Sequence, residues 1–225
     1  MSDNSAETSN REKLSVSELL KKEENILKEQ AGIVELEPVY KIILAGDGAV
    51  GKSSMVDSMT GHPFSETYII TMGCQFNNLS VELPDLEKTV KLQIWDLSGQ
   101  PHFSEVRKQF YNGTDLAVLV IDLSRLAITF ENIPEWISEI LDNSESPSIP
   151  MIIVGNKVDT VRNDEKASVQ QEIDKYLLNL QENVPKIFND GKPAFIPASA
   201  KVGLNIKEIF QLAAIKAVLW RAKNP

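Results

Sequence analysis

Apolar runs alternate with amphipathic stretches along most of the chain. Six short runs between residues 39 and 197 are rich in aliphatic and β-branched side chains, which is typical of buried strands. Between these runs, apolar residues recur at intervals of three and four, as they do on one face of a helix. The expected strands span residues 39–45, 74–83, 90–95, 116–121, 151–154 and 194–197. The expected helices span residues 52–59, 105–111, 133–141, 168–180 and 206–220.

This alternation predicts an α/β fold. A mostly parallel sheet of six strands, with helices on both faces, is the arrangement that buries strands of this kind. Pro84 and Asp85 separate the second strand from the third and predict a tight turn, so these two strands are expected to form an antiparallel hairpin. Asn205 precedes the last helix and Glu208 follows three residues later, a pattern that predicts a capped helix start.

The first 37 residues differ in character from the rest. Residues 1–13 are rich in Ser, Asn and Glu, so we expect them to be disordered. Apolar residues then recur with helical period over residues 15–30, which predicts a short amphipathic helix followed by a linker. This helix has three interpretations: it docks on its own domain, binds a partner protein, or enters a membrane interface. The last is disfavoured because its polar face mixes Lys with Glu and it has no aromatic residue.

Composition excludes some classes of function. The net charge of −9 argues against a nucleic-acid partner, because such proteins carry a basic surface. The single cysteine, Cys74, excludes an internal disulfide and suits a reducing compartment. No run of about 18 apolar residues occurs, so we expect no membrane-spanning helix. We also expect no secretory signal, and no myristoyl or prenyl anchor.

A phosphate-binding loop follows the first strand. Residues 46–53 read Gly-Asp-Gly-Ala-Val-Gly-Lys-Ser and match G-x-x-x-x-G-K-[ST] between a strand and a helix. Such a loop aims consecutive N–H groups at one point, and the following helix adds its positive end, as a polyphosphate requires. Lys52 is expected to bridge the outer phosphates, and Ser53 to ligate Mg²⁺. The nucleotide-binding residues expected here are Ala49, Val50, Gly51, Lys52, Ser53 and Ser54.

A base-recognition motif follows the fifth strand. Asn156-Lys157-Val-Asp159 comes directly after it, so the motif and the phosphate loop are expected at one sheet edge. The Asp159 carboxylate can accept hydrogen bonds from N1–H and N2–H₂ of guanine, whereas adenine has no donors in that pattern. The sixth strand ends in Ser199-Ala200-Lys201, where small residues let a backbone N–H approach the base; alone, this segment is equally an ordinary loop.

Taken together, these motifs resemble the Ras superfamily of small GTPases, and most of all its Rab-like branch. The resemblance covers residues 40–220, and five motifs occur in family order. Besides the three above, these are Thr71 in Thr-Met-Gly and Asp96-Leu-Ser-Gly99-Gln100. The resemblance implies a P-loop G domain over residues 38–221, an extension over residues 1–37 and a tail over residues 222–225.

The resemblance also implies roles for single residues. Thr71, like Ser53, would ligate Mg²⁺ through its hydroxyl, and Asp96 would hold a water bound to Mg²⁺. The Gly99 N–H would contact the γ-phosphate of GTP. Gln100 would orient the attacking water, which makes Gln100, Lys52 and Thr71 the expected catalytic residues. Phe64 falls where the family packs an aromatic against guanine, although a simple loop aromatic is the alternative. An aromatic effector triad is expected, with a purely core role as its alternative, at Phe76, Trp95 and Phe110.

The implied function is a GTP/GDP switch in signalling or vesicle traffic, with slow hydrolysis of GTP. We expect a cytoplasmic monomer that meets effector, exchange and GTPase-activating proteins, with peripheral membrane association left open. Three features depart from the prenylated family members: the C-terminal cysteine is missing, Pro101 replaces the usual Glu, and the segment around residues 184–193 is long. The long segment serves either a partner or nothing beyond a tolerated surface loop. A scaffold that binds GTP without hydrolysing it, and a P-loop ATPase or nucleoside kinase, are the alternative functions.

Overall fold

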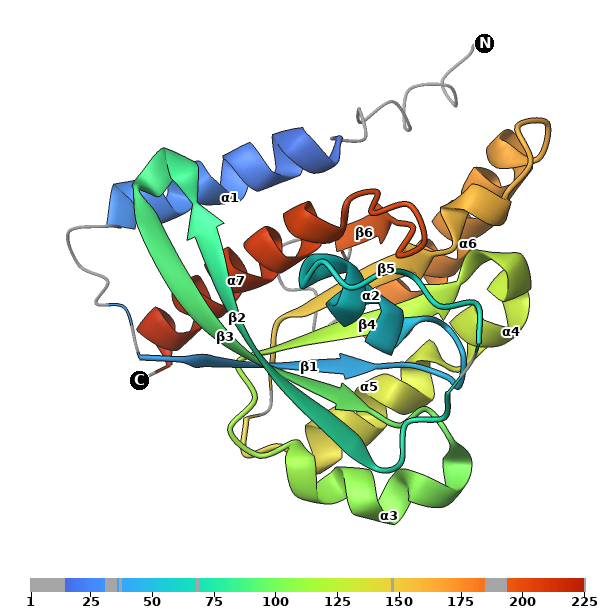
Figure 1. The fold of residues 1–225 in the computed structure, drawn as a ribbon, viewed down its shortest axis with the longest axis horizontal. Coiled ribbons are helices and arrows are strands. Elements are labelled where there is room, and N and C mark those ends of the chain that lie inside the picture. The colour runs from blue at the N-terminus through green and yellow to red at the C-terminus, as the bar shows by residue number, and fades with distance from the viewer. Residues whose placement is uncertain are drawn as a thin grey trace, which may run out of the picture.

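The sheet has six strands in the order β2-β3-β1-β4-β5-β6, and only β2 runs antiparallel to its neighbour (Figure 1). The computed structural model describes residues 15–30, 36, 38–67, 69–146, 148–184 and 194–224. The α/β fold with a mostly parallel sheet is therefore confirmed. The strands are β1 Tyr40–Ala45, β2 Cys74–Leu83, β3 Lys88–Leu97, β4 Leu116–Asp122, β5 Met151–Asn156 and β6 Ala194–Pro197.

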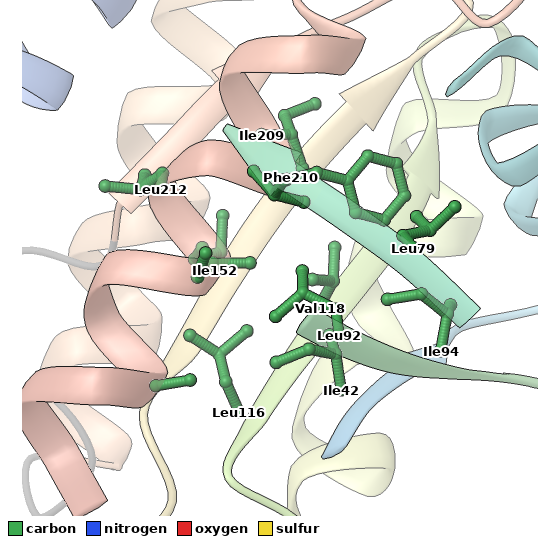
Figure 2. Packing of buried hydrophobic residues seen from close by; sticks show 14 of the residues in the cluster. Ile42, Leu79, Leu92, Ile94, Leu116, Val118, Ile152, Ile209, Phe210 and Leu212 are labelled. Carbon is green, nitrogen blue, oxygen red and sulfur yellow. The ribbon is translucent and has the colours of Figure 1, made fainter. Parts of the chain in front are cut away.

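Helices cover both faces of this sheet. The helices are α1 Val16–Gln30, α2 Lys52–Met59, α3 Ser104–Arg107, α4 Leu126–Glu131, α5 Ile133–Asp142, α6 Lys166–Asn183 and α7 Ile206–Lys223. Alternate residues of β1 enter two separate cores, as the pleat of a strand requires. Ile42 and Leu44 pack with α2 and α7, whereas Ile43 and Ala45 pack with α5 and α6. Figure 2 shows the first core, where Ile209 and Phe210 of α7 lie over the central strands.

The antiparallel hairpin is confirmed. All ten residues of β2 pair with β3, from Cys74 opposite Leu97 to Leu83 opposite Lys88. A short 3-10 helix over Pro84–Leu86 and Glu87 in the left-handed region make the turn. Because the hairpin continues beyond the central sheet, β3 is longer at both ends than its apolar run indicates.

Two local predictions need correction, and one helix was missed. The expected helix over residues 105–111 is only a four-residue α3 between the 3-10 segments Pro101–Phe103 and Lys108–Phe110. Helix α4 is too short to show a period, so the sequence did not reveal it. Asn205 does not cap α7 through its side chain: it adopts a left-handed conformation with φ 59°, and its Nδ2 donates to the Pro197 carbonyl at 2.8 Å.

Helix α1 lies beside α7 and the end of the hairpin (Figure 1). Leu27 is buried there, and Lys216 of α7 contacts Glu23 at 2.8 Å. Lys28 lies 3.7 Å from Asp85 at the hairpin turn. In this structure α1 is docked on the domain that follows it. The predictions for residues 1–13, for the linker over residues 31–35 and for the loop over residues 185–193 lie outside the described residues.

Candidate functional site

A cavity of about 540 Å³ lies at the edge of the sheet where the parallel strands end. Ligands of open α/β sheets bind at this edge. Thirteen of the sequence-predicted residues line the cavity: Ala49, Gly51, Lys52, Ser53, Ser54, Phe64, Thr71, Gly99, Asn156, Lys157, Asp159, Ala200 and Lys201. Four others do not line it: Val50, Asp96, Gln100 and Ser199. The structure thus brings segments more than 100 residues apart in the chain around one space.

The phosphate loop connects β1 to α2 through backbone conformations that favour glycine. Gly46 has φ 133° and Gly51 has φ 99°. A Cβ atom on Gly51 would lie 2.2 Å from Nδ2 of Asn156, and one on Gly46 would lie 2.2 Å from the Val120 carbonyl oxygen. Both glycines are therefore required by space as well as by torsion. Helix α2 starts at Lys52, so its positive end faces the cavity.

The Lys52 side chain lies against the phosphate loop and binds it through its ammonium group. Its Nζ donates to the carbonyl oxygens of Gly46 at 2.6 Å and Asp47 at 2.8 Å. Burial lowers the pKa of Lys52 to about 8, although the nearby charges of Asp96 and Asp47 act in the opposite direction. A buried cation whose partners are neutral carbonyl oxygens is well prepared to bind a polyanion.

Oxygen atoms from three segments converge beside the phosphate loop. The hydroxyl oxygens of Ser53 and Thr71 lie 3.1 Å apart, and Ser53 Oγ donates to Oδ2 of Asp96. The other carboxylate oxygen of Asp96 is buried and has no hydrogen-bond partner among the described residues. Burial raises the pKa of Asp96, and the hydrogen bond from Ser53 only partly offsets this. An unpaired carboxylate oxygen next to two hydroxyl groups fits Mg²⁺, which prefers oxygen ligands.

Gly99 approaches the phosphate loop closely enough to exclude any side chain. A Cβ atom there would lie 2.3 Å from the carbonyl carbon of Asp47. Gln100 comes next, with φ −83° and ψ 135°, directly before Pro101. The residue before a proline is confined to such extended conformations. Pro101, which departs from the family pattern, therefore restrains the backbone of the predicted catalytic residue.

Asn156 connects the loops on the base side of the cavity. Its Nδ2 donates to the Val50 carbonyl at 2.8 Å, and its Oδ1 accepts from the Ala200 amide at 3.0 Å. Asn156 is almost fully buried, so these bonds are shielded from water. Val50, although absent from the cavity wall, is thus tied through its main chain to the loop that is predicted to bind the base.

Lys157 stands at the end of β5 in a left-handed conformation, with φ 64°. Its Nζ donates to the Ala49 carbonyl and to Oδ2 of Asp122, both at 2.8 Å. Burial alone would raise the pKa of Asp122, but hydrogen bonds from Lys157, Ser124 and Arg125 outweigh it and lower that pKa. Sequence reasoning missed Asp122. Its signal is an acidic residue at the carboxyl end of a buried strand.

Asp159, Lys201 and Phe64 also line the cavity. Asp159 accepts a hydrogen bond from Ser199 Oγ, which places Ser199 behind the carboxylate and away from the cavity wall. The Lys201 ammonium lies 5.7 Å from the centre of the Phe64 ring, and that ring is 42% exposed. An exposed aromatic ring offers a flat surface on which a base can stack.

The three aromatics of the expected effector triad form one row on the hairpin and the segment after it. The Phe76 and Trp95 rings are 5.6 Å apart and edge to face, and Trp95 and Phe110 are 5.4 Å apart. Phe76 is half exposed, so a purely core role does not describe it. Neighbouring segments expose further apolar side chains: Ile69, Ile70, Met72 and Val106.

Strand, loop and helix thus place most of the residues predicted to bind phosphate, cation and base around one cavity. This combination defines the class of protein, a P-loop GTPase G domain.

Comparison with known proteins places the chain within this class. The family model for the Ras family matches residues 41–219. The chain is 34% identical over 183 residues to Ras-related protein RABG3f of Arabidopsis thaliana, covering 80% of this chain and 82% of that protein. It is 31% identical over 183 residues to Rab7 of Pisum sativum, with the same coverage. It is 32% identical over 192 residues to RabC of Dictyostelium discoideum, covering 84% and 90%.

This chain therefore belongs to the Ras family, in its Rab-like branch, and is a small GTPase that hydrolyses GTP. Membership in the family brings guanine-nucleotide binding, and regulator and effector proteins as partners in general. None of the helices that the structure describes combines the length and the apolar character needed to cross a membrane.

Proposed function

We propose that this protein is a molecular switch that binds GTP with Mg²⁺, hydrolyses it slowly, and changes the conformation of two segments when the γ-phosphate is lost. The single observation that supports this most is the 3.1 Å approach of Thr71 Oγ1 to Ser53 Oγ beside Asp96. It joins a segment of exposed loop to the phosphate site, which is what a γ-phosphate sensor requires.

The proposed roles follow the contacts. Lys52 leaves the carbonyls of its own loop to bind the outer phosphates, and backbone N–H groups of residues 49–54 bind the rest. Ser53, Thr71 and Asp96 hold Mg²⁺, which when bound supplies positive charge next to the phosphates. Gly99 contacts the γ-phosphate through its N–H, and Gln100 orients the attacking water. Asp159 pairs with the N1–H and N2–H₂ groups of guanine.

Catalysis of this kind depends on positioning and charge rather than covalent chemistry. Ras itself, when no partner supplies an arginine, turns over on the order of once in tens of minutes. We expect a similarly slow rate here and acceleration by an activating protein that supplies an arginine.

Two further proposals concern the partner proteins and the cellular location. The aromatic row of Phe76, Trp95 and Phe110, with the apolar side chains beside it, is proposed as the effector surface. We propose a cytoplasmic monomer that acts in signalling or vesicle traffic, and peripheral association with membranes stays an open question for experiment.

The test is a single-turnover assay in which the protein is loaded with GTP, Mg²⁺ is added, and phosphate release is followed. The switch hypothesis expects slow, complete release of one phosphate per protein. A scaffold that binds GTP without hydrolysing it would release none. Competition by GDP and ADP separates both from an ATPase or nucleoside kinase, which would prefer ADP.

A further inference from the structure

Arg107 is a buried cation that the nucleotide-binding motifs do not explain. It lies on α3 and is 3% exposed. Its Nε and one terminal nitrogen donate to the two carboxylate oxygens of Glu139 on α5, at 2.8 Å and 2.7 Å. Tyr111 also donates to Glu139, at 2.6 Å. Burial alone would raise the pKa of Glu139, but these hydrogen bonds outweigh it and lower that pKa, so the pair is ionic.

The remaining terminal nitrogen of Arg107 faces the segment that carries Gln100. It donates to the carbonyl oxygens of Ser98 at 3.1 Å and of Gln100 at 2.8 Å. These two carbonyls flank Gly99, whose backbone lies against the phosphate loop. One rigid guanidinium thus fixes the main chain on both sides of the residue expected to contact the γ-phosphate.

Pro101 and Arg107 restrain Gln100 in complementary ways. The proline confines the Gln100 backbone to the extended region, where it is found with ψ 135°. The guanidinium then holds the carbonyl that this torsion orients. Neither restraint depends on a residue of the phosphate loop.

The same face of α5 also holds the phosphate loop. Asn132 and Trp136 donate to the two carboxylate oxygens of Asp47, at 2.8 Å and 2.9 Å. The Arg107 guanidinium lies over the Trp136 ring, 4.5 Å from its centre. Asn132 is the N-cap of α5, and Trp136 and Glu139 lie on one side of that helix, so α5 sets the phosphate loop and the Gln100 segment in a fixed relation.

We propose that Arg107, held by Glu139, is a positioning residue for GTP hydrolysis that keeps Gln100 in place beside the phosphate site. This inference rests on the proposed function, because it assigns Arg107 a part in the hydrolytic step. A displacement of the order of 1 Å at such a site can slow a reaction by roughly 100-fold. Arg107 acts through the main chain of Gln100 and does not itself line the cavity.

The test compares Arg107→Lys with the wild-type protein in single-turnover phosphate release. Lysine keeps the charge, but one ammonium cannot bind both carboxylate oxygens and both carbonyls in the fixed geometry of a guanidinium. We expect phosphate release to slow by about tenfold or more. GDP affinity should stay unchanged, because the phosphate loop and base loops keep their own contacts.

Arg221→Lys is the matched control. Arg221 also binds a buried carboxylate, Asp115, through two nitrogens, and it also lies over an aromatic ring, that of Tyr40, at 5.1 Å. Asp115 precedes β4, so this pair lies at the opposite edge of the sheet from the cavity. The control should lower stability and leave phosphate release at the wild-type rate.

A second comparison separates positioning from stability. In a Gln100→Ala background, Arg107→Lys should slow phosphate release no further, because the residue that it positions is gone. If Arg107→Lys does not fold, Glu139→Gln provides the same comparison, since it removes the ionic partner while keeping the side-chain shape.

If the wild-type protein hydrolyses GTP and Arg107→Lys releases phosphate at the same rate, the inference is overturned and the proposed function stays intact. Equal slowing in the wild-type and Gln100→Ala backgrounds would overturn it in the same way. A wild-type protein that binds GTP but releases no phosphate would overturn both.

Discussion

Asn156 donates from Nδ2 to the Val50 carbonyl at 2.8 Å while its Oδ1 accepts from the Ala200 amide at 3.0 Å. One buried amide therefore joins the phosphate loop, the base loop and the loop after β6. An amide side chain is required there because one end must donate and the other must accept.

Asn156→Ala is expected to lower both stability and nucleotide affinity. It leaves a buried carbonyl and a buried N–H without partners, which costs about 1–3 kcal/mol for each unpaired group. Urea unfolding and GDP titration measure the two effects. Asn183→Ala is the control, because Asn183 is exposed and donates only within α6. A variant that binds GDP like the control would contradict the connecting role of Asn156.

Asp159→Asn should change which base the protein prefers. The carboxylate only accepts hydrogen bonds, as guanine N1–H and N2–H₂ require, whereas an amide both accepts and donates. Xanthine carries an oxygen where guanine carries the N2 amino group, so it matches the amide. Competition with GDP, XDP and ADP tests this. We expect the affinity for GDP to fall and the affinity for XDP to rise. If the order of the three affinities stays unchanged, the base does not bind at Asp159.

Thr71→Ala removes one of the three oxygen groups beside the phosphate loop. Its hydroxyl lies 3.1 Å from that of Ser53. We expect a higher Mg²⁺ requirement and loss of the GTP-dependent conformation, with a smaller change in GDP affinity, because the γ-phosphate contact is the one removed. Titration of Mg²⁺ with a non-hydrolysable GTP analogue and with GDP measures this. Equal loss for both nucleotides would refute the assignment.

Local sequence patterns predicted most of the secondary structure and the loops at the strand ends correctly. The strands and the longer helices follow from apolar period, whereas the short α3 and α4 do not. The loops at strand ends follow from glycine-rich and Asn-Lys-x-Asp motifs that are contiguous in sequence. The turn at Pro84 and Asp85 predicted the hairpin correctly, because its chemistry is also local. Such signals place a residue on a sheet edge, and the sheet edge then assembles the cavity.

The sequence did not predict contacts between residues that are far apart along the chain. Arg107 and Glu139 are 32 positions apart, and nothing near either one indicates a partner. Asn205 has the sequence pattern of a helix N-cap, but its side-chain amide donates to the carbonyl of Pro197 in β6 instead. In both cases tertiary packing decides which hydrogen bond forms, and a one-dimensional pattern holds no information about it.

Glu24 on α1 provides the pH prediction. The side chain is 5% exposed. Burial raises its pKa and the Asp85 carboxylate adds to this, while Lys28 and Lys21 offset part of the effect. Lys216 of α7 pairs instead with neighbouring Glu23. The fold therefore favours the protonated form of Glu24, so its contribution to stability is present below the unfolded pKa and is lost as pH rises through the folded pKa.

Glu24→Gln should accordingly raise Tm relative to the wild-type protein at about pH 7.5, with the difference vanishing near pH 4, where glutamate is mostly protonated in the unfolded chain as well. Thermal unfolding followed across this pH range measures the difference in Tm between the variant and the wild-type protein. Glu29→Gln, which removes the same charge from an exposed position of the same helix, is the control and should show a smaller difference. Identical curves for the two variants would mean that the docked position of α1 does not bury Glu24, and that α1 contributes nothing to stability through this residue.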